Sequence, residues 1–411
     1  MKLLLISMNY SPELTGIGKY SGEMASGLAA RGHQVRVICA PPYYPAWQIS
    51  PPYSGWRYTR QLEQPGVTVY RCPLWVPRRP SAARRLLHQA SFALSNFPVV
   101  LGLALSWRPQ VVLVVAPATA CAPAAWLGAL LSGAKSWLHV QDLELDAAFQ
   151  LGFLSGQRLQ RWALRAERGL LRAFDRVSTV SGRMLDKVRQ KQVEPDRTSL
   201  LLNWVDLSVV DPQADAAAAV QLRATLGLLP SQKVLLFSGT MNRKQGLQVL
   251  LQAAQLLESR RDLVFVLCGG GEMRPSLEAA AASLGNVRFL DLRPAAELGA
   301  LLVMADIHLL PQLRNAADLV MPSKLGGMLA SGRPVIAGAE AGSEIARFIQ
   351  GCGVCVEPES ASAFVQAVLN LCDDDSLRRQ LGTAARQLAH DKLAFNSVLD
   401  GLDLELKALL R

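Results

Sequence analysis

The sequence predicts an α/β protein built from two doubly wound parallel-sheet domains that face each other across a cleft. The chain has 411 residues with 50% hydrophobic composition, which is enough to bury two cores of ordinary domain size. Strand-like apolar runs alternate with helical stretches in both halves, and residues 206–219, which lack apolar periodicity, separate them. We therefore expect domains over residues 1–205 and 206–390. A C-terminal helix over 391–411 is expected to pack back toward the first domain.

The first domain opens with a strand, a loop, a helix and a second strand. The strand is KLLLIS (2–7), the helix covers 19–32 and ends at a glycine, and the next strand is HQVRVICA (33–40). The loop at 40–56 is rich in Pro, Tyr and Trp, and we expect it to be a mobile loop or lid facing the acceptor. Later strands are expected at 109–117, 135–142, 175–181 and 197–205.

The second domain repeats this alternation of strands and helices. Its strands are expected at 231–239, 262–271, 286–292, 305–312, 332–338 and 351–358. The last of these contains Cys352 and Cys355, which we interpret as part of a short buried strand, because no second cysteine pair completes a zinc site. The other cysteines are scattered and the chain opens without a secretory signal pattern, so we expect a reducing, cytoplasmic compartment.

Positive charge is concentrated near the start of the chain. The formal net charge is +10, and residues 1–100 hold 11 Lys/Arg against three Asp/Glu. Four of these arginines follow Trp75 and precede an apolar stretch: Arg78, Arg79, Arg84 and Arg85. Basic side chains beside Trp and Leu suit an anionic membrane surface or a phosphorylated acceptor. Nucleic acid is not expected, because no nucleic-acid-binding motif is present. A solvated basic surface without a partner remains the alternative.

Two uncharged stretches raise the question of a membrane span. Residues 109–134 are long enough to cross a bilayer, but Pro117 and Pro123 interrupt them, and we interpret them as a strand, a loop and a buried helix. Residues 89–107 contain Ser and Asn and are expected to form an interfacial or core helix. We therefore expect the protein to be peripherally associated with the inner face of the cell membrane without crossing it.

Three turns at strand ends predict a site for an anionic ligand, since ligands of open α/β sheets bind beyond the carboxyl ends of the strands. Gly16 and Gly18 follow the first strand, where backbone amides can approach an anion, although a plain tight turn explains them equally well. The second turn, SGTMNRKQG, begins at Ser238 and presents Arg243 and Lys244. A solvated helix start is the alternative there.

The third turn, MPSK, contains Pro322, Ser323 and Lys324 and opens a helix that runs to Gly332. Its free amides, helix dipole and lysine favour a phosphate group. When a glycosidic bond to a nucleotide diphosphate breaks, negative charge develops on the leaving diphosphate, and donors already in place lower the barrier. The turn therefore suits a sugar transfer reaction.

Together these motifs resemble those of family 4 of the retaining glycosyltransferases. The resemblance rests on the GIG turn followed by LAARGHQV, on GTMNRKQG, on CGGGEMR and on PSKLGGMLASGRPVIAG, and it covers nearly the whole chain. It is strongest for members that build bacterial extracellular polysaccharide of the colanic acid type or O-antigen. It implies a GT-B fold of two Rossmann-like domains, retention of anomeric configuration, no cofactor and no obligatory metal. The donor implied is a GDP- or UDP-linked sugar, and the acceptor is a lipid-linked oligosaccharide or a polysaccharide.

The resemblance also implies roles for individual residues. The donor would be bound mainly by the second domain, and the residues implied to line the donor site are Gly16, Gly18, Gly239, Arg243, Lys244, Glu272, Ser323 and Lys324. His139 and Asp142, in WLHVQDLELD, match the position where relatives carry a catalytic histidine or acid, and Asp146 follows them. A histidine at a strand end is also a common structural residue, so the choice between His139 and Asp142 stays open.

One departure from the family pattern concerns ribose recognition. Many members carry two glutamates eight positions apart, and the matching positions here are Leu319 and Gly327. Neither can hydrogen-bond a sugar through its side chain. The candidates to recognise the ribose in place of these glutamates are Asp318, Glu344 and Glu272, although Glu272 can equally cap a helix.

The sequence predicts a glycosyltransferase that moves a sugar from a nucleotide-diphosphate donor to a lipid-linked or polysaccharide acceptor. Two alternatives remain. A nucleotide-sugar epimerase uses the same scaffold, and the missing glutamates are also compatible with a non-catalytic partner of a polysaccharide assembly complex.

Overall fold

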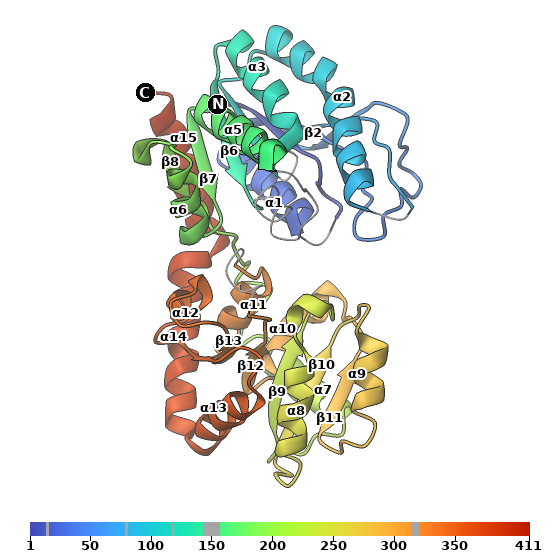
Figure 1. The fold of residues 1–411 in the computed structure, drawn as a ribbon, viewed down its shortest axis with the longest axis vertical. Coiled ribbons are helices and arrows are strands. Elements are labelled where there is room, and N and C mark those ends of the chain that lie inside the picture. Colours follow the sequence, from blue (N-terminus) through green and yellow to red (C-terminus); the bar gives the residue numbers. More distant parts are fainter. Residues whose placement is uncertain (14–15, 79–80, 117–118, 143–156, 315–320) are drawn as a thin grey trace. The chain divides into compact units, whose positions relative to one another are not determined.

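The chain forms two compact units in the computed structural model, which describes all residues except 14–15, 79–80, 117–118, 143–156 and 315–320 (Figure 1). Unit 1 comprises Met1–Leu202 and Val398–Arg411, and unit 2 comprises Asn203–Ser397. The expected boundaries after residues 205 and 390 compare with observed ones after 202 and 397. Each unit is an open twisted sheet covered by helices on both faces, so the expected doubly wound fold class is confirmed.

Unit 1 contains an eight-stranded sheet in the order β3-β4-β2-β1-β5-β6-β7-β8, parallel except for the β3–β4 pair. Its strands are β1 (Lys2–Ser7), β2 (Gln34–Cys39), β3 (Thr59–Gln64), β4 (Val67–Arg71), β5 (Val111–Ala116), β6 (Lys135–Val140), β7 (Arg176–Thr179) and β8 (Thr198–Leu200). Every residue of β5 is buried, as expected for a β-branched run in the middle of a parallel sheet. The strand order reverses beside β1, which places the carboxyl end of β1 where such sheets bind ligands.

The helices of unit 1 include the two uncharged stretches. They are α1 (Gly16–Ala30), α2 (Ala82–Ser106), η1 (Thr119–Cys121), α3 (Ala122–Ser132), α5 (Gln157–Ala173), α6 (Gly182–Gln190) and η2 (Pro195–Arg197). The strand and the helix expected over residues 109–134 are confirmed by β5 and α3, while the loop expected at Pro117 lies outside the described residues. The expectation that this helix is buried is only half right, because α3 covers the sheet with small residues on one side and exposes large apolar residues on the other.

The C-terminal helix α15 (Phe395–Leu409) joins unit 1 through one ion pair and one hydrogen bond between a histidine and a carboxylate. Arg31 Nη2 lies 2.7 Å from Asp400 Oδ1, and the buried His33 Nε2 lies 2.7 Å from Asp403 Oδ1. Helix α15 thus caps the end of α1 and the turn before β2.

Unit 2 contains a six-stranded parallel sheet in the order β11-β10-β9-β12-β13-β14. Its strands are β9 (Lys233–Ser238), β10 (Leu263–Cys268), β11 (Val287–Leu290), β12 (Ile307–Leu310), β13 (Val335–Gly338) and β14 (Gly353–Val356). Its helices are α7 (Ala216–Thr225), η3 (Arg243–Gln245), α8 (Gln248–Leu256), α9 (Arg274–Ala280), η4 (Ala295–Glu297), α10 (Leu298–Val303), α11 (Lys324–Ala330), α12 (Glu344–Phe348), α13 (Ala361–Asp373) and α14 (Asp375–Leu393). The strand order reverses between β9 and β12, so the ligand crevice of this sheet is expected at their carboxyl ends.

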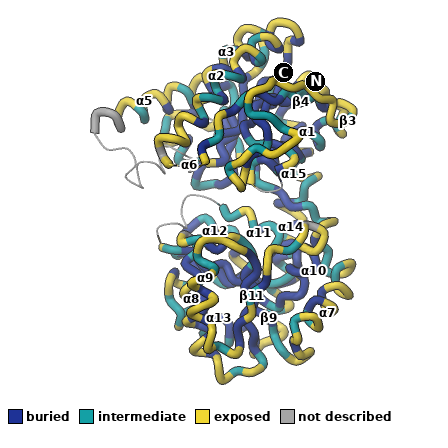
Figure 2. Tube along the Cα trace, turned by 90° about the vertical axis from the view of Figure 1, so that its right-hand side faces the viewer, coloured by how far each residue is buried: buried dark blue, intermediate teal, exposed yellow. Residues whose placement is uncertain are grey.

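Burial within each unit follows the layers (Figure 2). The central strands are buried and the outer sides of the helices are exposed. Strand β14 departs from the expectation of a buried strand, because it lies at the edge of the sheet and Cys355 is exposed while Cys352 is buried. An edge strand has a neighbour on one side only, which leaves its side chains partly open to solvent.

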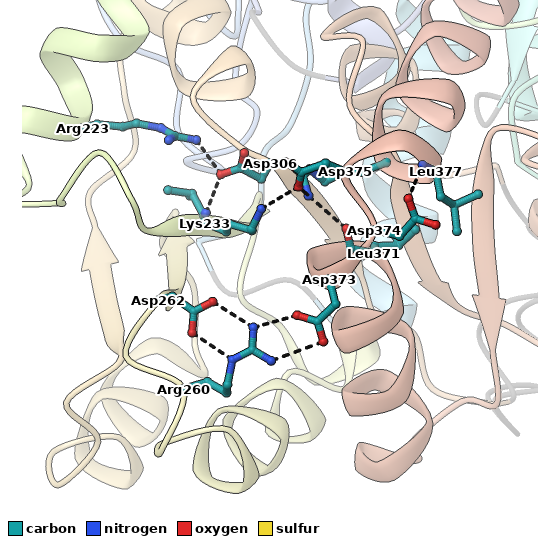
Figure 3. Close-up of polar contacts among 12 residues, drawn as sticks. Arg223, Lys233, Arg260, Asp262, Asp306, Leu371, Asp373, Asp374, Asp375 and Leu377 are labelled. Carbon is teal, nitrogen blue, oxygen red and sulfur yellow. Dashed lines mark hydrogen bonds and ion pairs between the residues drawn. The ribbon is translucent and has the colours of Figure 1, made fainter.

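Ion pairs hold the amino ends of the unit 2 strands to the helices around them (Figure 3). The pairs are Arg260–Asp262 at 2.8 Å, Arg260–Asp373 at 2.9 Å, Lys233–Asp375 at 2.8 Å and Arg223–Asp306 at 2.6 Å. Lys233 opens β9, and Asp262 and Asp306 immediately precede β10 and β12. These charged residues therefore neutralise one another at the end of the sheet that lies away from the expected ligand crevice.

Candidate functional site

Close backbone packing shapes the carboxyl end of β9. The turn after this strand begins at Gly239, with a φ of +144°, and its N–H donates to Cys268 O across 3.0 Å. The neighbouring loop after β10 stacks on it so tightly that a Cβ on Gly269 would lie 2.0 Å from Gly239 O, and a Cβ on Gly271 would lie 2.5 Å from Met241 O. The glycines of CGGGE therefore permit two loops to touch.

Lys324 enters this turn from α11. Its Nζ donates to Gln245 Oε1 across 2.6 Å and lies 4.2 Å from the centroid of the Phe237 ring. A Cβ on Gly239 would lie 3.4 Å from Lys324 Cδ, so the glycine leaves room for the lysine stem. The structure thus brings together the PSK motif and the SGTMNRKQG turn, which lie about eighty residues apart in the sequence.

The partners of the Lys324 ammonium in the described part of the chain are uncharged. Burial lowers its pKa to about 7, and among the described residues no carboxylate forms an ion pair with it. Gln245 and the face of Phe237 are weaker partners than a carboxylate, since one is neutral and the other offers only a ring quadrupole. An anionic ligand beside Nζ would favour the charged form of this lysine and be held by it. The arrangement suits a phosphate or diphosphate group.

The turn between β9 and α8 adds further polar groups. Arg243 opens η3 with an exposed side chain, whereas the side chain of Lys244 lies outside the described part of the chain. Asn242 Oδ1 and Gln312 Oε1 are buried and have no hydrogen-bond partner among the described residues. Both follow strands at the reversal of strand order, β9 and β12, where a ligand hydroxyl or amide could supply the missing donor. Sequence analysis missed these two residues and Gln245 because uncharged amides give no charge signal.

The other residues around the PSK motif give weaker evidence for a phosphate-binding site. Ser323 is exposed and makes no capping hydrogen bond, and α11 begins only at Lys324 and has seven residues. Its dipole is therefore a weaker anion attractor than the longer helix that the sequence suggested. At Gly327 a Cβ would lie 3.0 Å from Leu302 Cδ1, so a glutamate there would crowd this leucine. Leu319 and Asp318 lie outside the described residues.

Glu272 and Glu344, two of the residues expected to recognise the ribose, follow the carboxyl ends of other strands in the unit 2 sheet. Glu272 is exposed just after the stacked glycines, and Glu344 is the first residue of α12, with its carboxylate 4.0 Å from Arg347 Nη2. Glu344 already has this arginine as a partner, and the side-chain hydrogen bond of Lys324 goes to Gln245 instead. The contacts around Lys324 therefore point to the phosphate portion of a ligand more firmly than to a ribose.

In unit 1, the glycines of the first turn have different environments. Gly16 has a φ of +59° and no atom within 4 Å of a Cβ placed on it, so it faces open space. Gly18 is buried against Glu13, and a Cβ there would lie 2.6 Å from Glu13 Cβ. Gly16 remains suited to line a ligand crevice, while Gly18 makes room for a buried carboxylate.

Glu13 ties the first turn to the loop at 40–56. Its Oε1 accepts from the N–H groups of Tyr43 and Tyr44 across 2.9 and 3.0 Å, and its Oε2 accepts from Asn9 Nδ2 across 2.8 Å. Burial raises the pKa of Glu13, and these hydrogen bonds oppose that shift. Tyr43 is itself buried, edge-on to the ring of Trp47. The beginning of the loop that we expected to be a mobile lid is therefore anchored to the sheet.

His139 is enclosed in the sheet of unit 1. Nδ1 lies 2.9 Å from Ser178 Oγ, and Nε2 lies 3.0 Å from the side-chain nitrogen of Gln141. Burial lowers the pKa of His139 to about 4, so the ring is neutral at pH 7. Asp142, by contrast, is exposed immediately after β6, and Asp146 lies outside the described residues. Of the two candidates, Asp142 is the one that a substrate can reach without breaking buried contacts.

Metal ligation finds no support in the described part of the chain. No group of three or more His, Cys, Asp or Glu side chains there is placed to hold a metal ion.

Two family models match this chain. A glycosyl transferase 4-like domain matches residues 15–204, and a glycosyl transferases group 1 domain matches residues 232–374. The putative colanic acid biosynthesis glycosyl transferase WcaI of Escherichia coli K12 is 42% identical over 407 residues, which cover 97% of this chain and 98% of that protein.

Solved structures show the same fold. Sucrose-phosphate synthase from Thermosynechococcus elongatus matches with a TM-score of 0.76 and 17% identity, over 99% of this chain and 98% of that one. Anabaena HepE, solved in complex with UDP and glucose, matches with a TM-score of 0.68 and 15% identity, over 99% of this chain and 100% of that one. At such low identity these two structures inform the fold alone.

Proposed function

The chain belongs to family 4 of the glycosyltransferases, which are retaining enzymes with the GT-B fold, and from this premise we propose a specific reaction for it. It transfers a sugar from a nucleotide-diphosphate donor to a lipid-linked or growing-polysaccharide acceptor. The reaction serves the synthesis of a bacterial extracellular polysaccharide of the colanic acid type, as the similarity to WcaI suggests.

The observation that carries this proposal is the position of Lys324. Its ammonium lies at the carboxyl end of β9 beside Gly239, with a neutral amide and an aromatic ring as its partners among the described residues. A donor diphosphate would supply a negative charge that the described residues around this cation do not provide. The diphosphate gains charge when the sugar leaves, so a cation fixed at that point favours the transition state over the bound donor.

Arg243 and Gln245 complete the proposed diphosphate site. Gln245 Oε1 accepts one of the three ammonium hydrogens of Lys324, which leaves the other two for phosphate oxygens. Arg243 opens the same 3-10 turn with an exposed side chain, and a guanidinium matches two oxygens of one phosphate. The donor is a GDP- or UDP-linked sugar, the class of donor that the likeness to the family implies.

We assign Asp142 to the sugar transfer step in unit 1. It lies at the carboxyl end of β6, next to the position that the family uses for a catalytic histidine or acid, and it is exposed. His139 holds the end of the strand in place through Ser178 and Gln141, which makes it a positioning residue.

We place the enzyme in the cytoplasm, peripherally bound to the inner face of the cell membrane, where a lipid-linked acceptor would be found. The basic first quarter of the chain supports this, because it carries 11 Lys/Arg against three Asp/Glu. Alkaline carbonate should release the protein from membranes, and retention in the membrane pellet would contradict a peripheral location.

The decisive experiment is transfer of radiolabel from a panel of nucleotide sugars to membrane lipid extracts. We expect one GDP- or UDP-linked sugar to label a lipid product. A panel that yields neither incorporation nor donor hydrolysis would overturn the proposal. Appearance of an isomerised nucleotide sugar without any acceptor would instead identify an epimerase.

A further inference from the structure

Helix α2 turns an apolar stripe toward solvent. Leu87, Leu94, Leu101 and Leu105 recur at helical spacing on one side, and three of them have exposed fractions of 61% (Leu87), 77% (Leu94) and 62% (Leu105). A helix on the surface of a soluble domain normally presents polar residues on that side. The stretch Ala83–Ser106 is long and apolar enough to cross a membrane, yet only 28% of its most apolar window is buried.

The opposite side of α2 belongs to the core of unit 1. Phe92, Val100 and Leu103 are buried in the main cluster under the sheet, and Asn96 Nδ2 donates to Cys121 Sγ across 3.0 Å. A helix that spans a bilayer would have to leave these contacts. The exposed stripe is therefore one face of a folded domain, and it can contact lipid only if the helix lies along the membrane surface.

Helix α3 extends the exposed apolar area. It packs directly against α2, where a Cβ on Gly128 would lie 2.7 Å from Val100 Cγ1, and Figure 1 shows the two helices side by side. Its outward side carries Trp126 and Leu130, again at helical spacing, and Leu130 is 62% exposed. We call the outward sides of these two helices the α2–α3 face.

Aromatic side chains flank the α2–α3 face along α2. Tyr58 donates its hydroxyl to Ser95 O across 2.9 Å, and the N–H of Trp75 donates to Ser91 Oγ across 3.1 Å, so both residues are fixed against the helix. Both side chains are exposed, and so is the neighbouring Trp56 at 81%. Tyr and Trp are the residues that favour the boundary between water and lipid.

The charge of this region has one sign. From Gln64 to Gln141 the sequence contains seven Lys/Arg and no Asp or Glu. Arg78, Arg84 and Arg85 are exposed at the amino-terminal end of α2. An apolar face with arginines at one end, in a stretch of sequence without Asp or Glu, is complementary to anionic phospholipid, whose acyl chains and headgroups match the two parts.

We propose that the α2–α3 face docks unit 1 on an anionic phospholipid bilayer, with the leucines of α2 and α3 entering the acyl boundary and the arginines meeting the headgroups. The inference rests on the proposed function only in that a lipid-linked acceptor gives the enzyme a reason to bind a bilayer. The docking itself requires neither donor nor acceptor and is measured without them.

The test is sedimentation of the full chain with vesicles of phosphatidylcholine alone and of phosphatidylcholine mixed with phosphatidylglycerol. Wild type should bind the mixed vesicles, and binding should weaken as salt is raised. Leu94→Glu places a charge in the centre of the face and should weaken binding roughly tenfold or more. The matched control is Leu404→Glu on α15, a leucine that is 68% exposed in the same unit, and this variant should bind as wild type does.

The α2–α3 face also predicts a role for its arginines. Arg78→Ala should weaken binding to the mixed vesicles by about fivefold and should leave any binding to pure phosphatidylcholine unchanged. Equal binding of wild type and Leu94→Glu would overturn the proposal, and so would absence of wild-type binding. A fall in the molar mass of the protein in solution caused by Leu94→Glu would overturn it as well, since the face would then contact a second copy of the chain.

Sugar transfer to a detergent-solubilised acceptor separates this inference from the proposed function. Leu94→Glu should retain that activity, because detergent replaces the need for a bilayer. Loss of vesicle binding with retained transfer in detergent supports the docking face. A wild type that binds vesicles but transfers no sugar from any donor would contradict the proposed function and leave the docking intact.

Discussion

A lysine lies at each end of strand β9, one within the strand and one reaching it from α11, and the two differ in the charge of their surroundings. Lys233 opens the strand and pairs with Asp375 at 2.8 Å, within a set of ion pairs that neutralise one another (Figure 3). Lys324 lies at the other end, where its Nζ donates to the neutral amide of Gln245. Hydrogen bonds from Lys233 and Arg378 lower the pKa of Asp375 to about 2, whereas burial lowers the pKa of Lys324 to about 7.

The difference indicates what each end of the strand is for. A cation that is already paired within the protein stabilises the fold and has little to offer a ligand. A buried cation without a counter-charge costs folding free energy, and such a cost is retained where it supports function. The carboxyl end of β9 is also the end at which open α/β sheets bind ligands. The charges at the amino end of β9 thus stabilise the fold, and the charge at its carboxyl end is suited to bind a ligand.

Removal of the uncompensated lysine should have the largest effect. Lys324→Met should lower kcat/KM for sugar transfer by roughly 10²–10³-fold, because the leaving diphosphate loses a fixed cation. The same substitution should raise the midpoint of thermal unfolding at neutral pH, because it removes a charge from a desolvated place. Steady-state kinetics and calorimetry on the same preparation measure both effects.

Lys233→Met is the matched control at the other end of β9. It should leave kcat/KM within about twofold of wild type and slightly lower the unfolding midpoint, since it removes an ion pair at the surface. If both variants lose stability and neither loses activity, the assignment of the carboxyl end to the donor diphosphate is wrong.

The second prediction concerns pH. With a pKa of about 7, Lys324 is increasingly neutral above pH 7 in the free protein, so binding of a nucleoside diphosphate must then take up a proton. Affinity should fall by up to about tenfold per pH unit above pH 7, where the ligand's own phosphates no longer titrate, until the pKa of the complex is reached. Titration calorimetry in buffers of different ionisation enthalpy reports the proton uptake directly.

Lys324→Arg provides the check, because a guanidinium stays protonated throughout this range. Its affinity for the nucleoside diphosphate should be independent of pH between about pH 7 and 9, above the range in which the terminal phosphate of the ligand titrates. A wild type whose affinity is equally flat would show that Lys324 does not meet the ligand.

Most of the strands and helices could be predicted from the sequence because both sheets are built from apolar runs. β5 and β10 are buried at every position, and the helices between such runs are amphipathic, so the alternation was visible. The hairpin of β3 and β4 was missed. β3 is exposed along nearly its whole length at the edge of the sheet, so TRQLEQ has no apolar pattern to reveal it.

The charged residues of the candidate site could be proposed from the sequence, but the contacts between its residues could not. Lys324 and Arg243 were found because cations beside glycine turns carry a chemical signal. Gln245 was passed over, although its contact with Lys324 defines the environment of the lysine, because the two residues meet only when the chain has folded. The stacked glycines after β10 were visible as a motif, but their role in loop packing depends on the neighbouring turn.

A third, smaller effect is expected from the partner of the lysine. Gln245→Leu removes the acceptor of Lys324 Nζ, which should further destabilise the ammonium and move the pH dependence of donor binding to lower pH. The loss of kcat/KM at pH 7 should be about fivefold to tenfold. A purely structural role for Gln245 would lower stability without moving the pH profile.

Gln245→Glu tests the same contact from the other side. A carboxylate would pair with Lys324 and raise its pKa, so the pH dependence should disappear from the neutral range. The same carboxylate would repel a diphosphate, and donor affinity should therefore fall. Higher affinity in this variant would contradict the proposed position of the phosphates.

The smallest effect is expected at the amino end of the sheet. Arg260 joins Asp262, just before β10, to Asp373 at the end of α13, and all three side chains are partly or largely exposed. Arg260→Ala should cost about 0.5–1 kcal/mol, since exposed ion pairs contribute little, and should lower the unfolding midpoint by ~2–4 °C. The cost should shrink at high salt, where exposed charges are screened.

The pH dependence of that cost follows from Asp262, whose pKa is held below its ordinary value of 3.8 chiefly by the hydrogen bond from Arg260. A depressed carboxyl pKa contributes stability above the unfolded value, and the contribution is lost as pH falls through the folded one. Wild type and Arg260→Ala should therefore differ near pH 7 and converge under strongly acidic conditions, as followed by thermal unfolding. A tenfold change in kcat/KM for this variant would mean that the two ends of the sheet are coupled, because charges paired this far from the donor turn should leave the transferred diphosphate unaffected.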